Sequence, residues 1–190
     1  YEIHERLVGS EMCIRDSAAV KRVSPEKFLL GEVWEDATTK YGFGHRRTYL
    51  LGKGLDSVMN YPFKNAVLDF VKGKPAEQAA GEILSICEHY PAPALNTALN
   101  FLSTHDTERA LTVIADEPAN GRGREWQSGR CVVGEAYEEG MLRLRMAYAI
   151  IYTLPGLPCL YYGDEIGMQG YRDPFNRGYY CWDSHDCLLY

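Results

Sequence analysis

Two acidic residues, each following an apolar run, are the features of this sequence best suited to chemistry. Glu32 lies in the string FLLGEVWE at 28–35, and Asp106 lies in STHDT at 103–107. An apolar run that ends in an acid predicts a buried strand with one carboxylate at its exposed end. Substrate loops gather at the carboxyl ends of strands in α/β proteins. Two carboxylates placed in this way indicate a site for glycoside cleavage.

The elements that would position these acids alternate between strand and helix along the chain. Such alternation predicts parallel strands joined by crossover helices. We expect strands at 27–33, 56–60, 97–103 and 158–162, and helices at 62–71, 75–89, 107–115 and 135–153. The segment 116–134 is polar and rich in glycine, so we expect an exposed loop there.

Two of the expected helices carry an apolar face. In the long helix the stripe comprises Leu142, Met146, Ile150 and Leu154. In the helix at 75–89 the face comprises Ala79, Ile83, Ile86 and Cys87. Apolar residues that recur at helical spacing are typical of a surface packed against a core, so we expect both faces to be buried.

Composition narrows the class of protein and of partner. The chain has 190 residues, 46% of them hydrophobic, which is ordinary for one globular core or part of a larger domain. A net charge of −6 argues against nucleic acid or an anionic membrane as the main partner, whereas a neutral sugar fits. The uncharged segment 146–163 contains Pro155 and Pro158, which would interrupt a membrane-spanning helix. We therefore expect no transmembrane helix.

Cysteines and acids give no sign of a cofactor or metal. The six cysteines, at 13, 87, 131, 159, 181 and 187, have no CxxC spacing, and most lie in apolar runs. We expect buried, reduced thiols rather than a disulfide framework or zinc site, which favours the cytoplasm over secretion. The acidic pair Asp164 and Glu165 offers too few oxygens for calcium, so we expect structural hydrogen bonding there.

Five ordered strings extend the pattern to most of the chain. They are LLGEVWEDA at 29–37, LDSVMNYPF at 55–63, STHDTERAL at 103–111, LPGLPCLYYGDEIG at 154–167 and GYRDPFNRG at 170–178. With these motifs the chain resembles α-amylase family glycoside hydrolases of the neopullulanase, cyclomaltodextrinase and maltogenic amylase type. The resemblance implies an α/β fold over 18–186: a partial (β/α)8 TIM barrel made of strands five to eight with their helices. Glu32 and Asp106 would then end strands five and seven, on one rim.

The resemblance also implies roles for individual residues. Glu32 is the general acid/base of a retaining mechanism, and Asp106 stabilises the transition state. The implied substrate-binding residues are His105, Trp34, Asp173 and Arg177. The implied partner is an α-glucan such as a maltooligosaccharide, cyclodextrin, pullulan or starch, cleaved at α-1,4 and in some relatives α-1,6 links. A calcium requirement and a homodimer of the full-length protein stay open.

Residue types alone leave other interpretations open. Glu32 can instead cap the next element or pair with Arg46 or Arg47, and His105 with Asp106 can be a structural pair. Asp173 and Arg177 can form a salt bridge within their loop, and the aromatic side chains Trp34, Tyr61 and Tyr162 can belong to the core. An α-glucan transferase on the same scaffold and a non-catalytic sugar-binding relative are the alternative functions.

The nucleophile of the resembled family has no counterpart in this sequence. Its Arg-x-Asp pattern would fall at Glu2–His4, where it is absent, and Arg15-Asp16 lacks a preceding apolar strand. The string LVGSEMCIRDS at 7–17 and the tail 187–190 resemble translated sequencing-adapter read-through. We therefore expect a non-native extension at 1–17, a non-native tail at 187–190, and a fragment that is inactive on its own.

Overall fold

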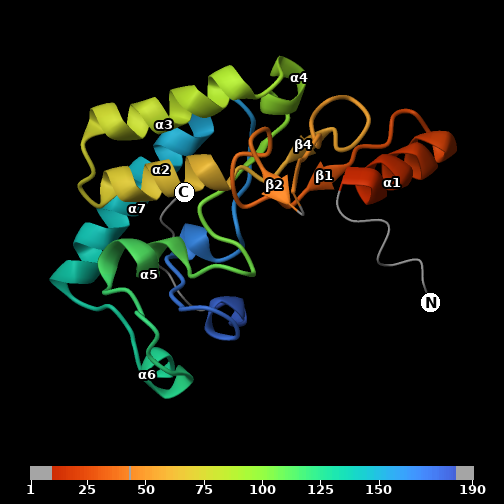
Figure 1. Cartoon of the computed structure of the whole chain (residues 1–190). Coiled ribbons are helices and arrows are strands. Elements are labelled where there is room, and N and C mark those ends of the chain that lie inside the picture. The colour runs from red at the N-terminus through yellow and green to blue at the C-terminus, as the bar shows by residue number, and fades with distance from the viewer. Residues whose placement is uncertain (1–9, 43, 183–190) are drawn as a thin grey trace. The chain divides into compact units, whose positions relative to one another are not determined.

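The computed structural model describes residues 10–42 and 44–182 (Figure 1). The chain divides into two compact units. The first unit comprises 1–63, 80–100 and 155–157, and the second comprises 64–79, 101–154 and 158–190. Of the segments expected to be non-native, 10–17 is helical, whereas 1–9 and 187–190 lie outside the described residues. The expected nucleophile position, at 2–4, lies outside them too.

Short strands and longer helices alternate through most of the chain. The α-helices are α1 (Ser10–Val23), α2 (Tyr61–Val71), α3 (Ala76–His89), α4 (Ala92–Leu95), α5 (Ala110–Ala115), α6 (Arg124–Ser128) and α7 (Glu135–Thr153). The strands are β1 (Leu30–Gly31), β2 (Tyr41–Gly42), β3 (His45–Arg46), β4 (Ser57–Val58), β5 (Leu99–Asn100) and β6 (Leu157–Pro158). Two 3-10 turns follow, η1 (Asp164–Ile166) and η2 (Phe175–Arg177).

In the first unit, β1, β4, β5 and β6 join in the order in which they occur in the chain, whereas β2 and β3 pair with each other as an antiparallel hairpin. β1 and β4 run parallel, with Leu30 opposite Ser57 and Gly31 opposite Val58. A parallel bridge from Met59 to Leu99 continues the pairing to β5. The Leu157 amide of β6 then donates to the Ala98 carbonyl at 2.8 Å. The predicted parallel arrangement is therefore confirmed for β1, β4 and β5.

The strands are shorter than the sequence predicted, and the strand expected at 158–162 is wrong beyond Pro158. There the carbonyl groups bond outside any sheet. The Tyr161 carbonyl accepts from the Asp164 amide in a turn, and the Tyr162 carbonyl accepts from the Arg109 side chain. Residues 159–162 therefore form a connection rather than a strand. Helices α1, α4 and α6 and the β2–β3 hairpin were not predicted.

In the second unit, α7 lies against α5 (Figure 1). The face that α7 buries is not the predicted one. The buried residues of α7 are Gly140, Met141, Leu144, Ala147, Tyr148 and Ile151. The predicted stripe is wrong, because Leu142 and Met146 are exposed. A strict four-residue spacing drifts around a helix by about 40° per step, so it does not follow one face. Gly140 explains why α7 buries this face. Only a glycine fits there, because a Cβ at 140 would lie 2.6 Å from the Cβ of Ala115 on α5.

Other expectations from the sequence have mixed outcomes. On α3, Ala79 and Ile86 are buried, while Ile83 and Cys87 are half-buried, so that face is confirmed. The described cysteines are free, as expected, but none is fully buried. Cys13, Cys87 and Cys159 are half-buried, and Cys131 and Cys181 are exposed. Within 10–42 and 44–182, no helix is long and apolar enough to cross a membrane.

Candidate active site

Glu32 lies just beyond the end of β1, where the pairing with β4 brings it beside Tyr61. Tyr61 follows β4 closely and opens α2. Its hydroxyl donates to Glu32 Oε1 at 2.6 Å. The Tyr61 side chain is almost fully buried, with 1% of its surface exposed, whereas Glu32 is exposed. A rigid donor from the core therefore fixes one oxygen of an accessible carboxylate.

Trp34 supplies an aromatic surface next to this carboxylate. Its ring stacks on Tyr61, with centroids 4.4 Å apart and planes 14° from parallel. Trp34 itself is 47% exposed. Indole surfaces of this kind are apolar on the face and polar at one edge, which suits contact with a sugar ring. The sequence left open whether Tyr61 contacts a sugar or belongs to the core. Its side chain is buried, and its hydroxyl donates to Glu32.

The segment after Glu32 is held by contacts of Asp36 and by a hydrogen bond from Arg46 to its backbone. Asp36 accepts from the Thr38 amide at 2.8 Å and contacts His89 Nδ1 at 2.6 Å. Burial raises the pKa of Asp36, but the hydrogen bonds from Thr38 and the contact with His89 outweigh it and lower the pKa below its ordinary value. Arg46 donates to the Thr38 carbonyl at 2.7 Å.

In the second unit, four predicted residues come together in one polar cluster. His105 Nε2 lies 3.2 Å from Asp106 Oδ2, and Arg177 Nη2 lies 3.3 Å from Asp106 Oδ1. Arg177 Nε donates to the His105 carbonyl at 3.1 Å and lies 3.5 Å from Asp173 Oδ1. The salt bridge between Asp173 and Arg177 is thus present. All four side chains are partly exposed, so a ligand can reach them.

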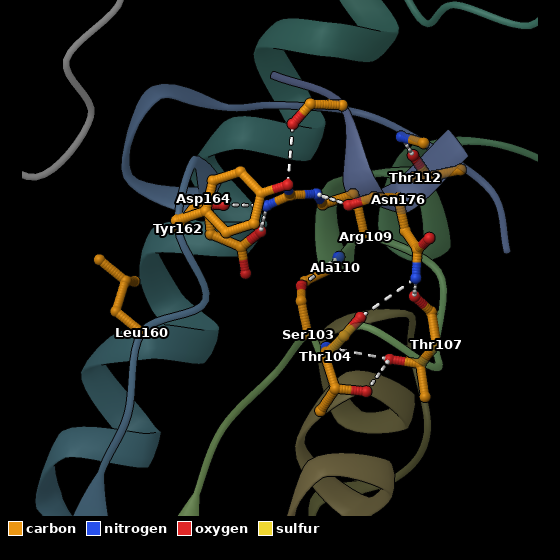
Figure 2. Close-up of polar contacts among 12 residues, drawn as sticks. Ser103, Thr104, Thr107, Arg109, Ala110, Thr112, Leu160, Tyr162, Asp164 and Asn176 are labelled. Atoms are coloured by element: carbon orange, nitrogen blue, oxygen red, sulfur yellow. Dashed lines mark hydrogen bonds and ion pairs between the residues drawn. The ribbon is translucent and has the colours of Figure 1, made fainter. Parts of the chain in front are cut away.

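Behind this cluster, a buried amide holds the turn that carries Asp106. Asn176 Nδ2 lies within hydrogen-bond distance of the Thr104 and Thr107 carbonyl oxygens, at 3.2 and 2.8 Å (Figure 2). It also lies 2.8 Å from the His105 carbonyl oxygen. Within the turn, the Asp106 amide donates to Thr104 Oγ1 at 3.2 Å. Asn176 is fully buried, with 0% of its surface exposed.

A buried ion pair lies next to Asn176. Arg109 is 0% exposed, and its Nη1 lies 3.2 Å from Asp164 Oδ1 (Figure 2). Arg109 Nε donates to the backbone carbonyl of Asn176 at 3.0 Å. Its guanidinium carbon lies 4.4 Å above the ring of Tyr161 and 4.6 Å above that of Tyr162. The expectation of structural hydrogen bonding at Asp164 is confirmed.

Asp164 is under two opposing influences. Burial raises the pKa of the Asp164 carboxyl, and hydrogen bonds from Ser103, Tyr148 and Arg109 oppose the increase. The Tyr148 hydroxyl donates to Asp164 Oδ2 at 2.5 Å. Burial prevails because the carboxyl has almost no contact with water, so the pKa of Asp164 lies above its ordinary value.

Sequence reasoning did not single out Tyr61 as the partner of Glu32, nor Asn176 and Arg109 as supporting residues. All three lie inside the quoted motifs, but only Arg109 is close in sequence to an acid of the site, three residues after Asp106. An arginine or asparagine in a motif is a weak signal for burial, since these residue types are mostly exposed. Within the described part of the chain, no group of three or more His, Cys, Asp or Glu side chains could hold a metal ion.

Comparison with protein families and curated relatives gives consistent matches. The family model described as "Alpha amylase, catalytic domain" matches residues 9–187. The chain is 32% identical over 198 residues to an amylopullulanase of Thermoanaerobacter thermohydrosulfuricus, covering 96% of the chain and 12% of that protein. It is 34% identical over 175 residues to a cyclomaltodextrinase of a Bacillus species, covering 90% of the chain and 26% of that protein. The chain thus spans only 12% and 26% of the length of these two relatives.

Solved structures show the same likeness in three dimensions. One match is the cyclic α-maltosyl-(1→6)-maltose hydrolase of Arthrobacter globiformis in complex with cyclic α-maltosyl-(1→6)-maltose. Its TM-score is 0.72 at 26% identity. That match covers 98% of the chain and 35% of the hydrolase. An α-amylase of Geobacillus thermoleovorans complexed with acarbose matches with a TM-score of 0.67 at 25% identity, over 96% of the chain and 35% of the amylase. The chain aligns with a portion of these TIM-barrel enzymes.

Proposed function

The chain belongs to the α-amylase family of glycoside hydrolases, and on this premise we propose that it carries two catalytic side chains of a retaining α-glucan hydrolase. Glu32 is the general acid/base, which protonates the leaving oxygen and then activates water. Asp106 stabilises the oxocarbenium-like transition state. The substrates are α-1,4-linked glucans, among them maltooligosaccharides and cyclodextrins.

The arrangement of Glu32 is the observation that carries this proposal. The hydrogen bond from the buried Tyr61 hydroxyl fixes Oε1, so the carboxyl keeps one orientation while it remains accessible. A general acid must present its proton in a fixed direction to a leaving oxygen within hydrogen-bond reach. The exposed ring of Trp34, stacked on Tyr61, provides a surface for the sugar on the same support. A carboxylate that merely capped a loop would need neither feature.

The cluster around Asp106 supports the second role. Positive charge develops on the sugar ring in the transition state, and a carboxylate already in place stabilises it without reorganisation. Contacts with His105 and Arg177 hold the Asp106 carboxylate on both oxygens. The same two side chains can also donate hydrogen bonds to sugar hydroxyl groups.

The relatives support the substrate class. Solved relatives include complexes with maltose and with acarbose. The curated relatives include enzymes named cyclomaltodextrinase and neopullulanase. Because the chain spans only part of each, the activity belongs to the intact enzyme that contains this segment. For the chain alone, which has no assigned nucleophile, we expect no hydrolysis of maltooligosaccharides.

The role of Glu32 is tested in the intact enzyme with two substrates. Cleavage of maltotriose requires protonation of the leaving oxygen. Cleavage of α-maltosyl fluoride does not, because fluoride is a good leaving group without a proton. We expect Glu32→Gln to lower kcat/KM for maltotriose by about 10²–10⁴-fold while an initial burst of fluoride release remains. Glu35→Gln is the matched control, because Glu35 is an exposed acid of the same segment, paired with Lys40. It should leave both reactions unchanged.

The role of Asp106 gives a different pattern. Asp106→Asn should slow both substrates, because the transition state carries ring charge whichever group leaves. Proton NMR of the first product should show the α-anomer, as retention requires. Wild-type rates in the Glu32→Gln enzyme on maltotriose, or a β-anomeric first product, would contradict the proposal. Chromatography of the same products separates hydrolysis from glucosyl transfer.

A further inference from the structure

The side chain of Asn176 is placed where it can orient the catalytic turn at 104–107. Its Nδ2 contacts the carbonyl oxygens of Thr104, His105 and Thr107. Of these residues, His105 directly precedes Asp106 and Thr107 directly follows it. These carbonyl groups converge on one amide nitrogen, so a rotation of the peptide that follows Thr104, His105 or Thr107 breaks a contact. The position of the Asp106 side chain therefore depends on Asn176.

η2 supplies contacts to the turn from two consecutive residues. Asn176 is buried and holds the backbone around Asp106, while Arg177 is partly exposed and contacts both the Asp106 carboxylate and the His105 carbonyl. Backbone and side chain of the turn are thus held from the same 3-10 turn.

Asn176 is itself fixed by a residue that cannot easily move. Arg109 Nε donates to the Asn176 carbonyl at 3.0 Å. The guanidinium is held by the Asp164 carboxylate and the Tyr162 carbonyl, and it lies against two tyrosine rings. Because arginine keeps its proton at every accessible pH, this donor is permanent. Figure 2 shows the chain of contacts from Asp164 through Arg109 and Asn176 to Thr104 and Thr107.

We propose that Asn176 is a positioning residue for Asp106, fixed in turn by Arg109. The proposal rests on the proposed function, since it presupposes that Asp106 stabilises the transition state. Asn176 does not touch substrate: it is fully buried, and it acts through the turn. Catalytic groups must be held within a fraction of an ångström of their working geometry, and a misplacement of about 1 Å costs about 10²-fold in rate.

The experiment measures kcat and KM of the intact enzyme for α-maltosyl fluoride, well below the midpoint of thermal unfolding. Asn176→Ala should lower kcat by about 10–100-fold with KM changed by less than about twofold, because a transition-state contact is lost. Asn176→Ser keeps one hydroxyl donor, so its kcat should lie between those of the wild type and Asn176→Ala. This variant also provides the test if Asn176→Ala folds poorly. Near-UV circular dichroism reports the folded fraction of each variant.

The matched control is Gln169→Ala. Gln169 is another side-chain amide of the second unit that holds a loop backbone, through its hydrogen bonds with the Val132 amide and carbonyl at 2.7 and 2.9 Å. Within the described residues, the hydrogen bonds of the Gln169 side chain go to Val132 and not to the turn at 104–107. Its loss should change kcat by less than about twofold. A Gln169→Ala variant as slow as Asn176→Ala would overturn the proposal.

A double-mutant cycle distinguishes positioning from general damage. If Asn176 acts through Asp106, its removal should cost less than about threefold in an Asp106→Asn background, because the role it supports is already gone. An equal loss in both backgrounds means that Asn176 affects folding generally and refutes the proposal. If Asp106→Asn alone keeps wild-type activity, the proposed function itself fails. A slow Asp106→Asn enzyme with an unaffected Asn176→Ala enzyme refutes only the positioning role.

Discussion

The buried pair formed by Arg109 and Asp164 should respond unequally to loss of its two members. Arg109 is 0% exposed and Asp164 is 2% exposed, so neither charge is stabilised by water. In Asp164→Asn the guanidinium keeps its charge without a counter-ion, since arginine does not deprotonate in proteins. In Arg109→Met the remaining carboxyl can become neutral by taking up a proton.

The expected magnitudes follow from these contacts. Removal of one partner of a buried ion pair costs about 3–5 kcal/mol in the free energy of unfolding, which we expect for Asp164→Asn. Arg109→Met loses the hydrogen bonds to the Asn176 and Tyr162 carbonyls, at about 1 kcal/mol each, plus the cost of keeping the Asp164 carboxyl neutral. Arg109→Met with Asp164→Leu should be close to neutral, because hydrophobic replacement of a whole pair often is.

The pH dependence of stability should distinguish the two single variants. Burial already raises the pKa of Asp164, and Arg109 is one of the groups that oppose the increase, so removal of Arg109 raises it further. A folded-state pKa above the unfolded value of about 3.9 means that stability is highest at low pH and falls as pH rises between the two values. Arg109→Met should therefore be less destabilised at pH 5 than at pH 7. Asp164→Asn gains no such relief.

Thermal unfolding of the intact enzyme, followed by circular dichroism at pH 5 and pH 7, measures both effects. The intact enzyme is larger than the roughly 150–250 residues for which a shift of about 2–4 °C per kcal/mol holds, so Asp164→Asn should lower Tm by a few degrees at both pH values. The Arg109→Met decrease should be smaller and should shrink at pH 5. Equal, pH-independent decreases for the two variants would show that Asp164 does not become neutral when Arg109 is removed.

Three further predictions concern other described residues. Tyr61→Phe removes the donor to Glu32 and should lower kcat for maltotriose in the intact enzyme by about tenfold, measured as reducing-sugar release. His89→Ala should lower the free energy of unfolding by about 1 kcal/mol at pH 7, because the contact with Asp36 is lost. The pKa of Asp36 is lowered in the folded state, so this loss should disappear as the pH falls below about 4. Urea titrations at several pH values measure it. Iodoacetamide at pH 8 with peptide mapping should label the exposed thiols before Cys159, because burial raises the pKa of that thiol.

Helix positions could be predicted from the sequence because their signals are local. α7 occupies the predicted 135–153, between Gly134 and the turn at Pro155 and Gly156. Strand lengths could not be predicted in this way, because a strand continues only where a neighbour offers backbone groups. The sequence of 159–162 is apolar, yet its carbonyls bond to a turn and to Arg109.

The buried face of α7 shows a second limit. Counting apolar residues favoured Leu142 and Met146, but the helix buries Gly140 and Tyr148 instead. Gly140 is buried because α5 approaches closely, and Tyr148 because its hydroxyl reaches Asp164. Both reasons depend on residues outside the helix, so no pattern within the helix could reveal them.

The candidate site was predicted from resemblance as far as the side chains that would face a substrate. The cluster of His105, Asp106, Asp173 and Arg177 is present as a set of contacts, and the catalytic roles within it stay predictions. What the sequence could not show is the support behind it. Arg109 and Asn176 are of residue types that usually lie on the surface, and only their partners distant in sequence explain their burial.

The buried support follows from the exposure of the acids themselves. A partly exposed carboxylate such as that of Asp106 can be reached by a ligand, but for the same reason core packing alone does not fix it. A turn that carries such a group has to be held by its backbone carbonyls, and only buried hydrogen-bond donors can do this without occupying the ligand's space. Asn176 and Arg109 are such donors, and the burial of a cation requires a buried acid, which is Asp164. The string DPFNR thus places Asn176 in the interior and Arg177 at the surface, in adjacent positions, because the turn needs both.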